Sequence, residues 1–216
     1  MKRIRKMKMD DQNLEVEVKF YLNDPAGFEK RLRSIGANLV QPRTHESNYR
    51  FDTPDLSLTR TRQVLRIRQD QNVIITYKGP ALADQPVSMR KEIELEVKDF
   101  EAARELLESL GFQISVLYEK YRTVYTLNQL EITIDEMPFG VFTEIEGGDA
   151  QTIERTAASL SLLWSQRILE SYLMLFDRVK QSRGLQLQNL TFAEFKGVTV
   201  SAKDLGVKAA DVTTYL

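Results

Sequence analysis

The stretch LEVEVKF, residues 14–20, shows the pattern that decides the fold of this chain. Apolar and charged side chains alternate along it, with Leu14, Val16, Val18 and Phe20 in one phase and Glu15, Glu17 and Lys19 in the other. Successive side chains of a β-strand point to opposite faces, so the alternation predicts a strand with one apolar and one charged face. The charged face needs water or partners of opposite charge.

The same period of two recurs along the chain and predicts about eight strands. They cover 14–21, NLVQPRTHESNYRFDTP (38–54), VLRIRQ (64–69), NVIITYKG (72–79), SMRKEIELEV (88–97) and roughly 112–127, 129–137 and 141–147. Only the polar pair DQ separates VLRIRQ from NVIITYKG, which is typical of a hairpin. The predicted sheet therefore grows by antiparallel steps.

Two amphipathic helices follow strands of this kind. In NDPAGFEKRLRSIGA, Asn23 or Asp24 can cap the helix, Pro25 suits its first turn and Gly36 ends it. The segment KDFEAARELLESLGF repeats the plan and has Gly111 just past its end. Helical patterns at about 150–162 and 167–181 complete the prediction, and the stripe of Tyr172 and its neighbours is interpreted as core.

Charged residues lie in phase on nearly every predicted strand. An antiparallel sheet with one solvated face is the ordinary explanation of such alternation. Here, however, pairs of carboxylates two positions apart recur in three strands, and cations occupy the same phase in three others. The in-phase residues are Glu15, Glu17, Lys19, Arg66, Arg68, Lys78, Arg90, Glu92, Glu94, Glu96, Lys120, Arg122, Asp135, Glu144 and Glu146.

A closed barrel would place these charged faces inside a lumen and remove the sheet edges. We therefore predict an α+β protein, a closed eight-stranded antiparallel β-barrel, or tunnel, with helices packed outside. Only the helices can cover the opposite, apolar faces, including that of Ile93, Leu95 and Val97. Ions enclosed in a lumen are costly unless they are paired or bound, so the tunnel should bind a charged ligand.

Composition excludes several other classes of function. The net charge of −1 and the pI near 6.0 give no general attraction to nucleic acid or to anionic membranes. The chain has no cysteine and one histidine, His45, which excludes disulfides and Cys/His zinc sites. No apolar run approaches the ~18 residues of a membrane span. We expect a cytoplasmic protein without a nucleic-acid or membrane partner.

The residue types in the predicted lumen indicate the ligand. Carboxylate oxygens suit Mg²⁺ or Mn²⁺, which share their coordination with substrate phosphates, and Arg and Lys hold the phosphate oxygens themselves. Displacement at phosphorus depends mainly on positioning and on neutralising charge, so it needs no Cys, His or Ser nucleophile. The pattern predicts a polyphosphate bound together with a divalent metal.

Several motifs occur in an order that resembles the CYTH superfamily, also called triphosphate tunnel metalloenzymes. They are EVEVKF, LRIR, TYKG, EIELEV, EKYR, ITIDEMPFG and TEIEG, spread over residues 14–176 together with ESYLMLF. The family includes class IV adenylyl cyclases, thiamine triphosphatases and inorganic triphosphatases. The resemblance implies an eight-stranded antiparallel tunnel, in agreement with the strand count.

The resemblance also implies roles for individual residues. It makes Glu15, Glu17, Asp135, Glu144 and Glu146 the expected metal ligands, and Glu15, Glu17, Lys19 and Asp135 the expected catalytic set. The expected substrate-binding residues are Lys19, Arg66, Arg68, Lys78, Glu94, Lys120 and Arg122. Among Glu92, Glu94 and Glu96, we choose Glu94 as the site residue because it is central in its strand. Ion pairs within the lumen explain the presence of all three carboxylates equally well.

Three functions remain open at this point. In a cyclase, ATP would yield cyclic AMP and pyrophosphate, and the segments TYKGP, EVEVKF and RFDTPD favour this branch by resemblance. In an inorganic or thiamine triphosphatase, water would attack a terminal phosphorus in the same tunnel. A non-catalytic module would bind nucleotide or polyphosphate, but binding alone does not call for the carboxylates. RNA 5′-triphosphate processing ranks last, because the chain lacks a basic patch for RNA.

We expect three segments in the chain. Residues 1–13 form a mobile basic leader, residues 14–181 the CYTH triphosphate-tunnel domain, and residues 182–216 a C-terminal extension with scattered apolar residues. The extension would pack back on the domain or bind a second copy, so a homodimer is one expected assembly.

Overall fold

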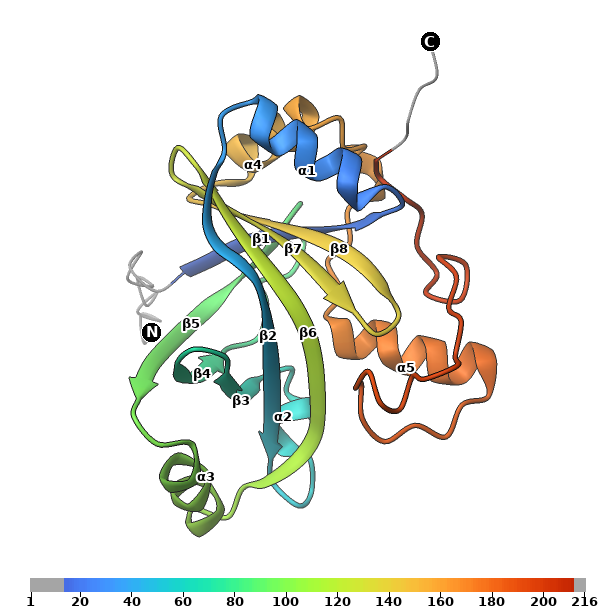
Figure 1. Ribbon diagram of the computed structural model, residues 1–216. Coiled ribbons are helices and arrows are strands. Elements are labelled where there is room, and N and C mark those ends of the chain that lie inside the picture. The colour runs from blue at the N-terminus through green and yellow to red at the C-terminus, as the bar shows by residue number, and fades with distance from the viewer. Residues whose placement is uncertain (1–13, 212–216) are drawn as a thin grey trace, which may run out of the picture.

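A computed structural model describes residues 14–211, and the basic leader expected over 1–13 lies outside them. Eight antiparallel strands close on themselves in the order β1-β5-β4-β3-β2-β6-β7-β8 (Figure 1). The strands are β1 (Leu14–Leu22), β2 (Asn38–Asp52), β3 (Val64–Gln69), β4 (Val73–Lys78), β5 (Ser88–Val97), β6 (Gln113–Leu127), β7 (Leu130–Met137) and β8 (Gly140–Glu146). The closed, antiparallel, eight-stranded prediction is confirmed.

The helices lie outside the ring of strands (Figure 1). They are α1 (Pro25–Ser34), α2 (Ser57–Arg60), α3 (Phe100–Ser109), α4 (Ala150–Ser159) and α5 (Tyr172–Arg183), with a 3₁₀ turn, η2 (Trp164–Gln166). Helix α1 begins where the Asp24 side chain accepts a hydrogen bond from Gly27 N, and it ends before Gly36, whose φ of 85° suits glycine. None of the helices within 14–211 is long and apolar enough to span a membrane.

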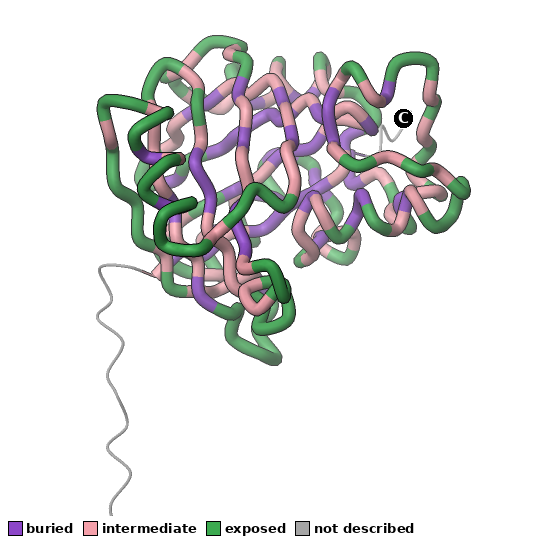
Figure 2. The backbone as a smooth tube through the Cα atoms, turned by 90° about the horizontal axis from the view of Figure 1, so that it is seen from below, coloured by how far each residue is buried: buried purple, intermediate pink, exposed green. Residues whose placement is uncertain are grey.

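Two apolar clusters join helices to the outer faces of the strands, and a third joins α5 to residues on the same face as the charged ones. Helices α1 and α4 pack on β1, β7 and β8 around Phe20 and Ile145, and α3 packs on β2 and β3 around Phe51 and Ile67. Helix α5 packs beside β8 with Phe142 at the contact. Buried backbone accordingly follows the strands, whereas the connecting loops are exposed (Figure 2). The alternate residues are thereby left to face the interior of the ring.

The expected helical cover is wrong at β5. Ile93 and Leu95 are 44% and 60% exposed on the outer face of this strand. The reason is geometric: α3 covers the β2–β3 side, and α1 and α4 cover the β1–β8 side, so the middle of β5 lies between the two covers. Binary patterning indicated which face is apolar, but not which helix would reach it.

The last helix also begins later than the predicted residue 167. Ile168 exchanges two backbone hydrogen bonds with Lys19, at 2.8 and 3.3 Å, which extends the backbone next to β1. Ser171 then caps α5 by accepting a hydrogen bond from Met174 N. This change of direction brings the start of α5 to the tunnel.

Residues beyond α5 pack back on the domain. Leu190 exchanges backbone hydrogen bonds with Leu117 and Glu119 beside β6, and Phe195 and Leu205 are buried against α5. At the end of the described chain, the Asp211 carboxylate accepts hydrogen bonds from the backbone N–H groups of Asn23 and Asp24, at 2.7 and 2.6 Å. The extension therefore connects α5 to the β1–α1 corner.

We expect Asp211→Ala to lower the free energy of unfolding by about 1–3 kcal/mol, because two part-buried N–H groups lose a charged acceptor. Urea denaturation measures the change. Lys208→Ala, an exposed position in the same segment, should shift the value by no more than about 0.5 kcal/mol. Equal stability of Asp211→Ala and the parent would show that the extension does not stabilise this corner.

Candidate active site

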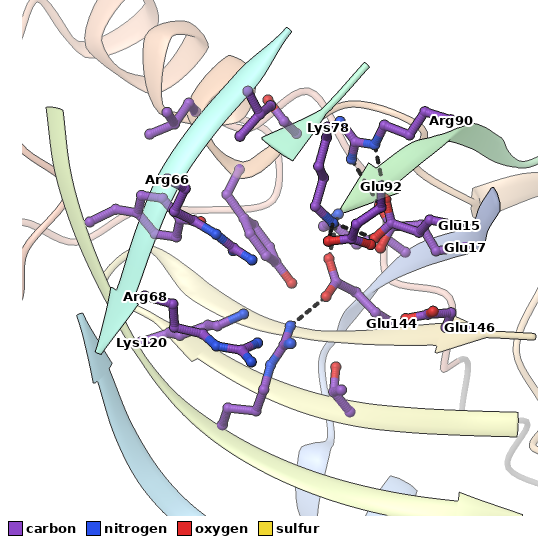
Figure 3. Close-up of a pocket in the computed structure, with 18 of the residues that line it drawn as sticks. Glu15, Glu17, Arg66, Arg68, Lys78, Arg90, Glu92, Lys120, Glu144 and Glu146 are labelled. Carbon is purple, nitrogen blue, oxygen red and sulfur yellow. Dashed lines mark hydrogen bonds and ion pairs between the residues drawn. The ribbon is translucent and has the colours of Figure 1, made fainter. Parts of the chain in front are cut away.

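A cavity inside the ring is lined mostly by charged side chains (Figure 3). Of the residues predicted for the site, the following line it: Glu15, Glu17, Lys19, Arg66, Arg68, Lys78, Glu94, Lys120, Arg122, Glu144 and Glu146. Asp135 does not. The structure adds Arg50, Arg90, Glu92, Tyr118, Glu131, Thr133 and Tyr172 to the lining.

Strand pairing brings these residues together from distant parts of the chain. Glu17 pairs with Glu146 and Lys19 with Glu144 across β1 and β8. Glu15 stands opposite Arg90 of β5. Directly paired residues share a face of the sheet, so each of these pairs points into the lumen together.

One wall of the cavity is cationic. Arg66 donates hydrogen bonds to the Tyr118 hydroxyl at 3.0 Å and to Thr76 at 3.2 Å, which fix its guanidinium. Its carboxylate neighbour Glu94 is 3.8 Å away. Arg68 and Lys120 lie on the same side (Figure 3). Glu94 therefore orients an arginine through an ion pair, one of the two explanations left open by the sequence.

The opposite wall is acidic and is largely paired with cations. Glu144 contacts Lys19 at 2.8 Å and Arg122 at 2.5 Å. Burial disfavours the ionised form of Glu144, but the nearby cations Lys19 and Arg122 hold the pKa of Glu144 well below its usual value. Glu15 forms ion pairs with Lys78 and Arg90. Cations from other strands thus hold Glu15 and Glu144 in place.

Glu146 and Glu131 form an acidic mouth at one end of the cavity. The two residues pair across β7 and β8, and Glu146 is also paired with Glu17. Within residues 14–211, Glu146 forms no ion pair. Partial burial, and then the carboxylates of Glu15 and Glu131, raise the pKa of Glu146 above its usual value. With its pKa raised to about 8, this carboxyl is mostly protonated near neutral pH, and a bound cation would stabilise its ionised form.

The donor set fits a hard divalent cation. Glu15, Glu17, Glu144 and Glu146 offer only oxygen ligands, the type that Mg²⁺ and Mn²⁺ prefer. As the described side chains lie, no three acidic or histidine residues converge on one point. Glu15, Glu17 and Glu144 instead turn toward the cations that pair with them. A metal would therefore require these carboxylates to exchange partners.

Asp135 lies beneath the cationic wall and is 0% exposed. Its carboxylate accepts hydrogen bonds from Lys120 at 3.1 Å, from Arg122 at 2.7 Å and from the Tyr172 hydroxyl at 2.9 Å. Every contact runs to a residue of the lining. In this position Asp135 orients the cations, whereas direct metal ligation would require it to leave these three partners.

Tyr172 has two roles, of which sequence reasoning found one. It belongs to the buried apolar cluster of α5, as interpreted, but Ser171, Tyr172 and Leu173 also line one end of the cavity. Lys19 Nζ lies 4.3 Å from the centre of the Tyr172 ring. The motif ESYLMLF was the available signal, because it breaks the apolar pattern with a polar pair before the tyrosine.

A family model described as the CYTH domain matches residues 13–171, which is most of the chain. The chain belongs to the CYTH domain family. The match confirms the resemblance seen in the ordered motifs. It ends at Ser171, directly before α5, so α5 and the extension lie beyond it.

Two relatives of this CYTH protein carry the name adenylate cyclase, one of them provisionally. It is 28% identical over 179 residues to a Methanocaldococcus jannaschii protein provisionally named an adenylate cyclase, covering 82% of this chain and 99% of the relative. It is 28% identical to adenylate cyclase CyaB of Aeromonas hydrophila, over 61% and 67% of the two chains. The solved PH1819 protein of Pyrococcus horikoshii matches with a TM-score of 0.63 and 28% identity, over 76% and 99% of the chains.

Proposed function

We propose that this CYTH protein is a divalent-cation-dependent enzyme that acts on triphosphates within its tunnel. One observation carries the proposal: the cavity inside the ring places a wall of cations opposite a wall of carboxylates (Figure 3). Cations alone would serve phosphate binding. The additional carboxylates are the ligands expected where a divalent metal ion is coordinated by both the protein and the phosphates.

The cations would hold the phosphate chain. Arg66, Arg68 and Lys120 lie on one wall (Figure 3), Arg122 contacts Glu144 of the other, and Lys19 and Lys78 reach the cavity from β1 and β4. Arginine suits this role because its planar group can donate two parallel hydrogen bonds to one phosphate. The hydrogen bonds that Arg66 and Arg122 make to neighbouring side chains hold them ready for substrate.

The carboxylates of Glu15, Glu17, Glu144 and Glu146 would hold Mg²⁺ or Mn²⁺. A bound divalent cation supplies charge neutralisation at the phosphate oxygens and lowers the pKa of a nucleophilic hydroxyl or water. Asp135, from beneath the wall, keeps Lys120 and Arg122 at fixed positions. We assign it this positioning role in preference to metal ligation.

The reaction that we propose first is cyclisation of ATP. The ribose 3′ oxygen forms a bond to the α-phosphorus and releases its hydroxyl proton. The bond between the α-phosphorus and the oxygen that bridges it to the β-phosphorus breaks, and pyrophosphate leaves. The names of the relatives from M. jannaschii and A. hydrophila support this choice at 28% identity. Neither relative shares enough identity to carry its substrate over by itself.

Hydrolysis of an inorganic or thiamine triphosphate is the second candidate, and one observation favours it. The two lining tyrosines, Tyr118 and Tyr172, already use their hydroxyls with Arg66 and Asp135. Most of the remaining lining is ionic. A lining of this kind suits a bare triphosphate at least as well as a nucleoside.

A product assay distinguishes these candidates. Purified protein is offered ATP, tripolyphosphate and thiamine triphosphate separately, each with Mg²⁺ or Mn²⁺, and cyclic AMP, pyrophosphate and orthophosphate are resolved. Cyclic AMP with pyrophosphate supports the cyclase. Orthophosphate from tripolyphosphate with ATP intact replaces it with a triphosphatase, and tight binding without any product replaces both with a non-catalytic binding module.

We expect Arg66→Met to weaken binding of tripolyphosphate by about tenfold to a hundredfold, the equivalent of one charged hydrogen-bonding group. Calorimetric titration measures the dissociation constant. Arg43→Met is the matched control, because Arg43 is on the outside of the ring, paired with Glu136. Equal affinity of Arg66→Met and the parent protein would remove Arg66 from the phosphate site.

A further inference from the structure

Arg90 bridges two carboxylates of the proposed metal site. It is on β5, directly opposite Glu15 in the ladder with β1. Its Nε lies 3.1 Å from Glu15 Oε2, and its Nη2 lies 3.2 Å from Glu17 Oε1 (Figure 3). The side chain is 16% exposed and lines the cavity. A guanidinium held by two carboxylates in this way is fixed in place.

The two carboxylates differ in their other partners. Glu15 also pairs with Lys78, which in turn contacts Glu92 at 3.1 Å. For Glu17, Arg90 is the one cation within ion-pair distance among residues 14–211. A divalent cation bound to Glu17 would therefore lie close to the Arg90 guanidinium, which already contacts this carboxylate. The two cations would repel each other at close range.

We propose that Arg90 is a resident counter-ion that competes with the divalent cation for Glu15 and Glu17. The inference rests on the proposed function, since it takes these carboxylates as metal ligands. Binding of the metal displaces the guanidinium into the cavity, where it becomes one more donor for a phosphate. Arg90 thereby couples metal binding to triphosphate binding and sets the metal affinity of the empty tunnel.

Two simpler roles for Arg90 predict different behaviour. If Arg90 only bound phosphate, its removal would leave affinity for the metal alone unchanged. If it only contributed positive charge to the cavity, then removal of any lumenal cation would strengthen metal binding equally. Arg68 separates the last case, because it lines the same cavity and its ion-pair partner is Asp70, at 4.0 Å.

The test is calorimetric titration of Mn²⁺ alone into the parent protein, Arg90→Met, Arg90→Lys and Arg68→Met. We expect Arg90→Met to bind Mn²⁺ about tenfold more tightly than the parent, because the charged hydrogen bonds that oppose binding are gone. Arg90→Lys should fall between them, since an ammonium cannot bridge both carboxylates as a planar fork does. Arg68→Met should gain less than about threefold, equivalent to screened charge at longer range.

Circular dichroism and urea denaturation confirm that each variant is folded, and Arg90→Lys tests the proposal should Arg90→Met fail to fold. Unchanged or weaker Mn²⁺ binding by the Arg90 variants would overturn the inference while leaving the proposed function intact. An equal gain in Arg68→Met would also overturn it. Absence of Mn²⁺ binding in every protein, with tripolyphosphate present as well, would overturn the proposed function together with the inference.

Discussion

Glu17→Gln is expected to reduce metal-dependent turnover by about a thousandfold, the scale of removing one essential electrostatic group from an active site. Glu17 is one of the proposed metal ligands and pairs with Arg90 in the lumen. The amide keeps the shape of the side chain but removes the negative charge that holds a divalent cation. Steady-state kinetics with Mn²⁺ measure the loss on whichever triphosphate the product assay identifies.

Stability should change little in the same variant. Glu17 faces a lumen and not an apolar core, so its replacement opens no cavity. The replacement also removes one of the carboxylate charges that, after burial, raise the pKa of Glu146. We expect a shift of no more than about 1 kcal/mol in the free energy of unfolding. Glu96→Gln is the control, because Glu96 is in phase on β5 but lies outside the cavity lining. Full turnover in Glu17→Gln would contradict the metal site.

Asp135→Ala is expected to cost about 3–5 kcal/mol of unfolding free energy, the usual result of breaking a buried ion pair from one side. The substitution leaves Lys120 with only the longer contact to Glu46, at 3.4 Å, and leaves the Tyr172 hydroxyl without its acceptor. Urea denaturation gives the value. Asp135→Asn should lose most of the same stability, since the shape remains and the charge does not.

The matched control is Glu136→Ala, the next residue of β7. Glu136 pairs with Arg43 on the outer surface, where both side chains are well exposed to solvent. Exposed pairs of this kind contribute about 0–1 kcal/mol. If Asp135→Ala were no less stable than Glu136→Ala, and if it lost metal affinity instead, Asp135 would be a metal ligand as the family resemblance implied.

The strand pattern was predictable because it depends only on neighbouring residues. Alternation in LEVEVKF and EIELEV specifies which side chains share a face, and the structure places those charged faces in one lumen. Which residues become partners across the ring could not be predicted in this way. Arg90 follows Glu15 by a long stretch of chain, and their pairing depends on the order in which β1 and β5 meet. The closed ring was predicted, but no local pattern specifies the order in which its strands meet.

How deeply each charged side chain is buried in the lumen could not be predicted from the sequence either. Asp135 and Glu144 are both in phase with the charged face, yet Asp135 is fully covered by Lys120, Arg122 and Tyr172. The same limit explains Ile93, whose outer face was expected to lie under a helix and is exposed. Periodicity indicates the direction of a side chain, but its cover is decided by how separate elements pack.

Crystals grown with Mn²⁺ and tripolyphosphate offer the most direct test of the central claim, that one tunnel holds a triphosphate together with a divalent cation. Anomalous scattering locates the manganese independently of the protein phases. We predict a manganese peak among Glu15, Glu17, Glu144 and Glu146, and phosphate density against Arg66, Arg68, Lys120 and Arg122. Manganese and phosphate bound only outside the ring, with the lumenal ion pairs intact, would contradict the account.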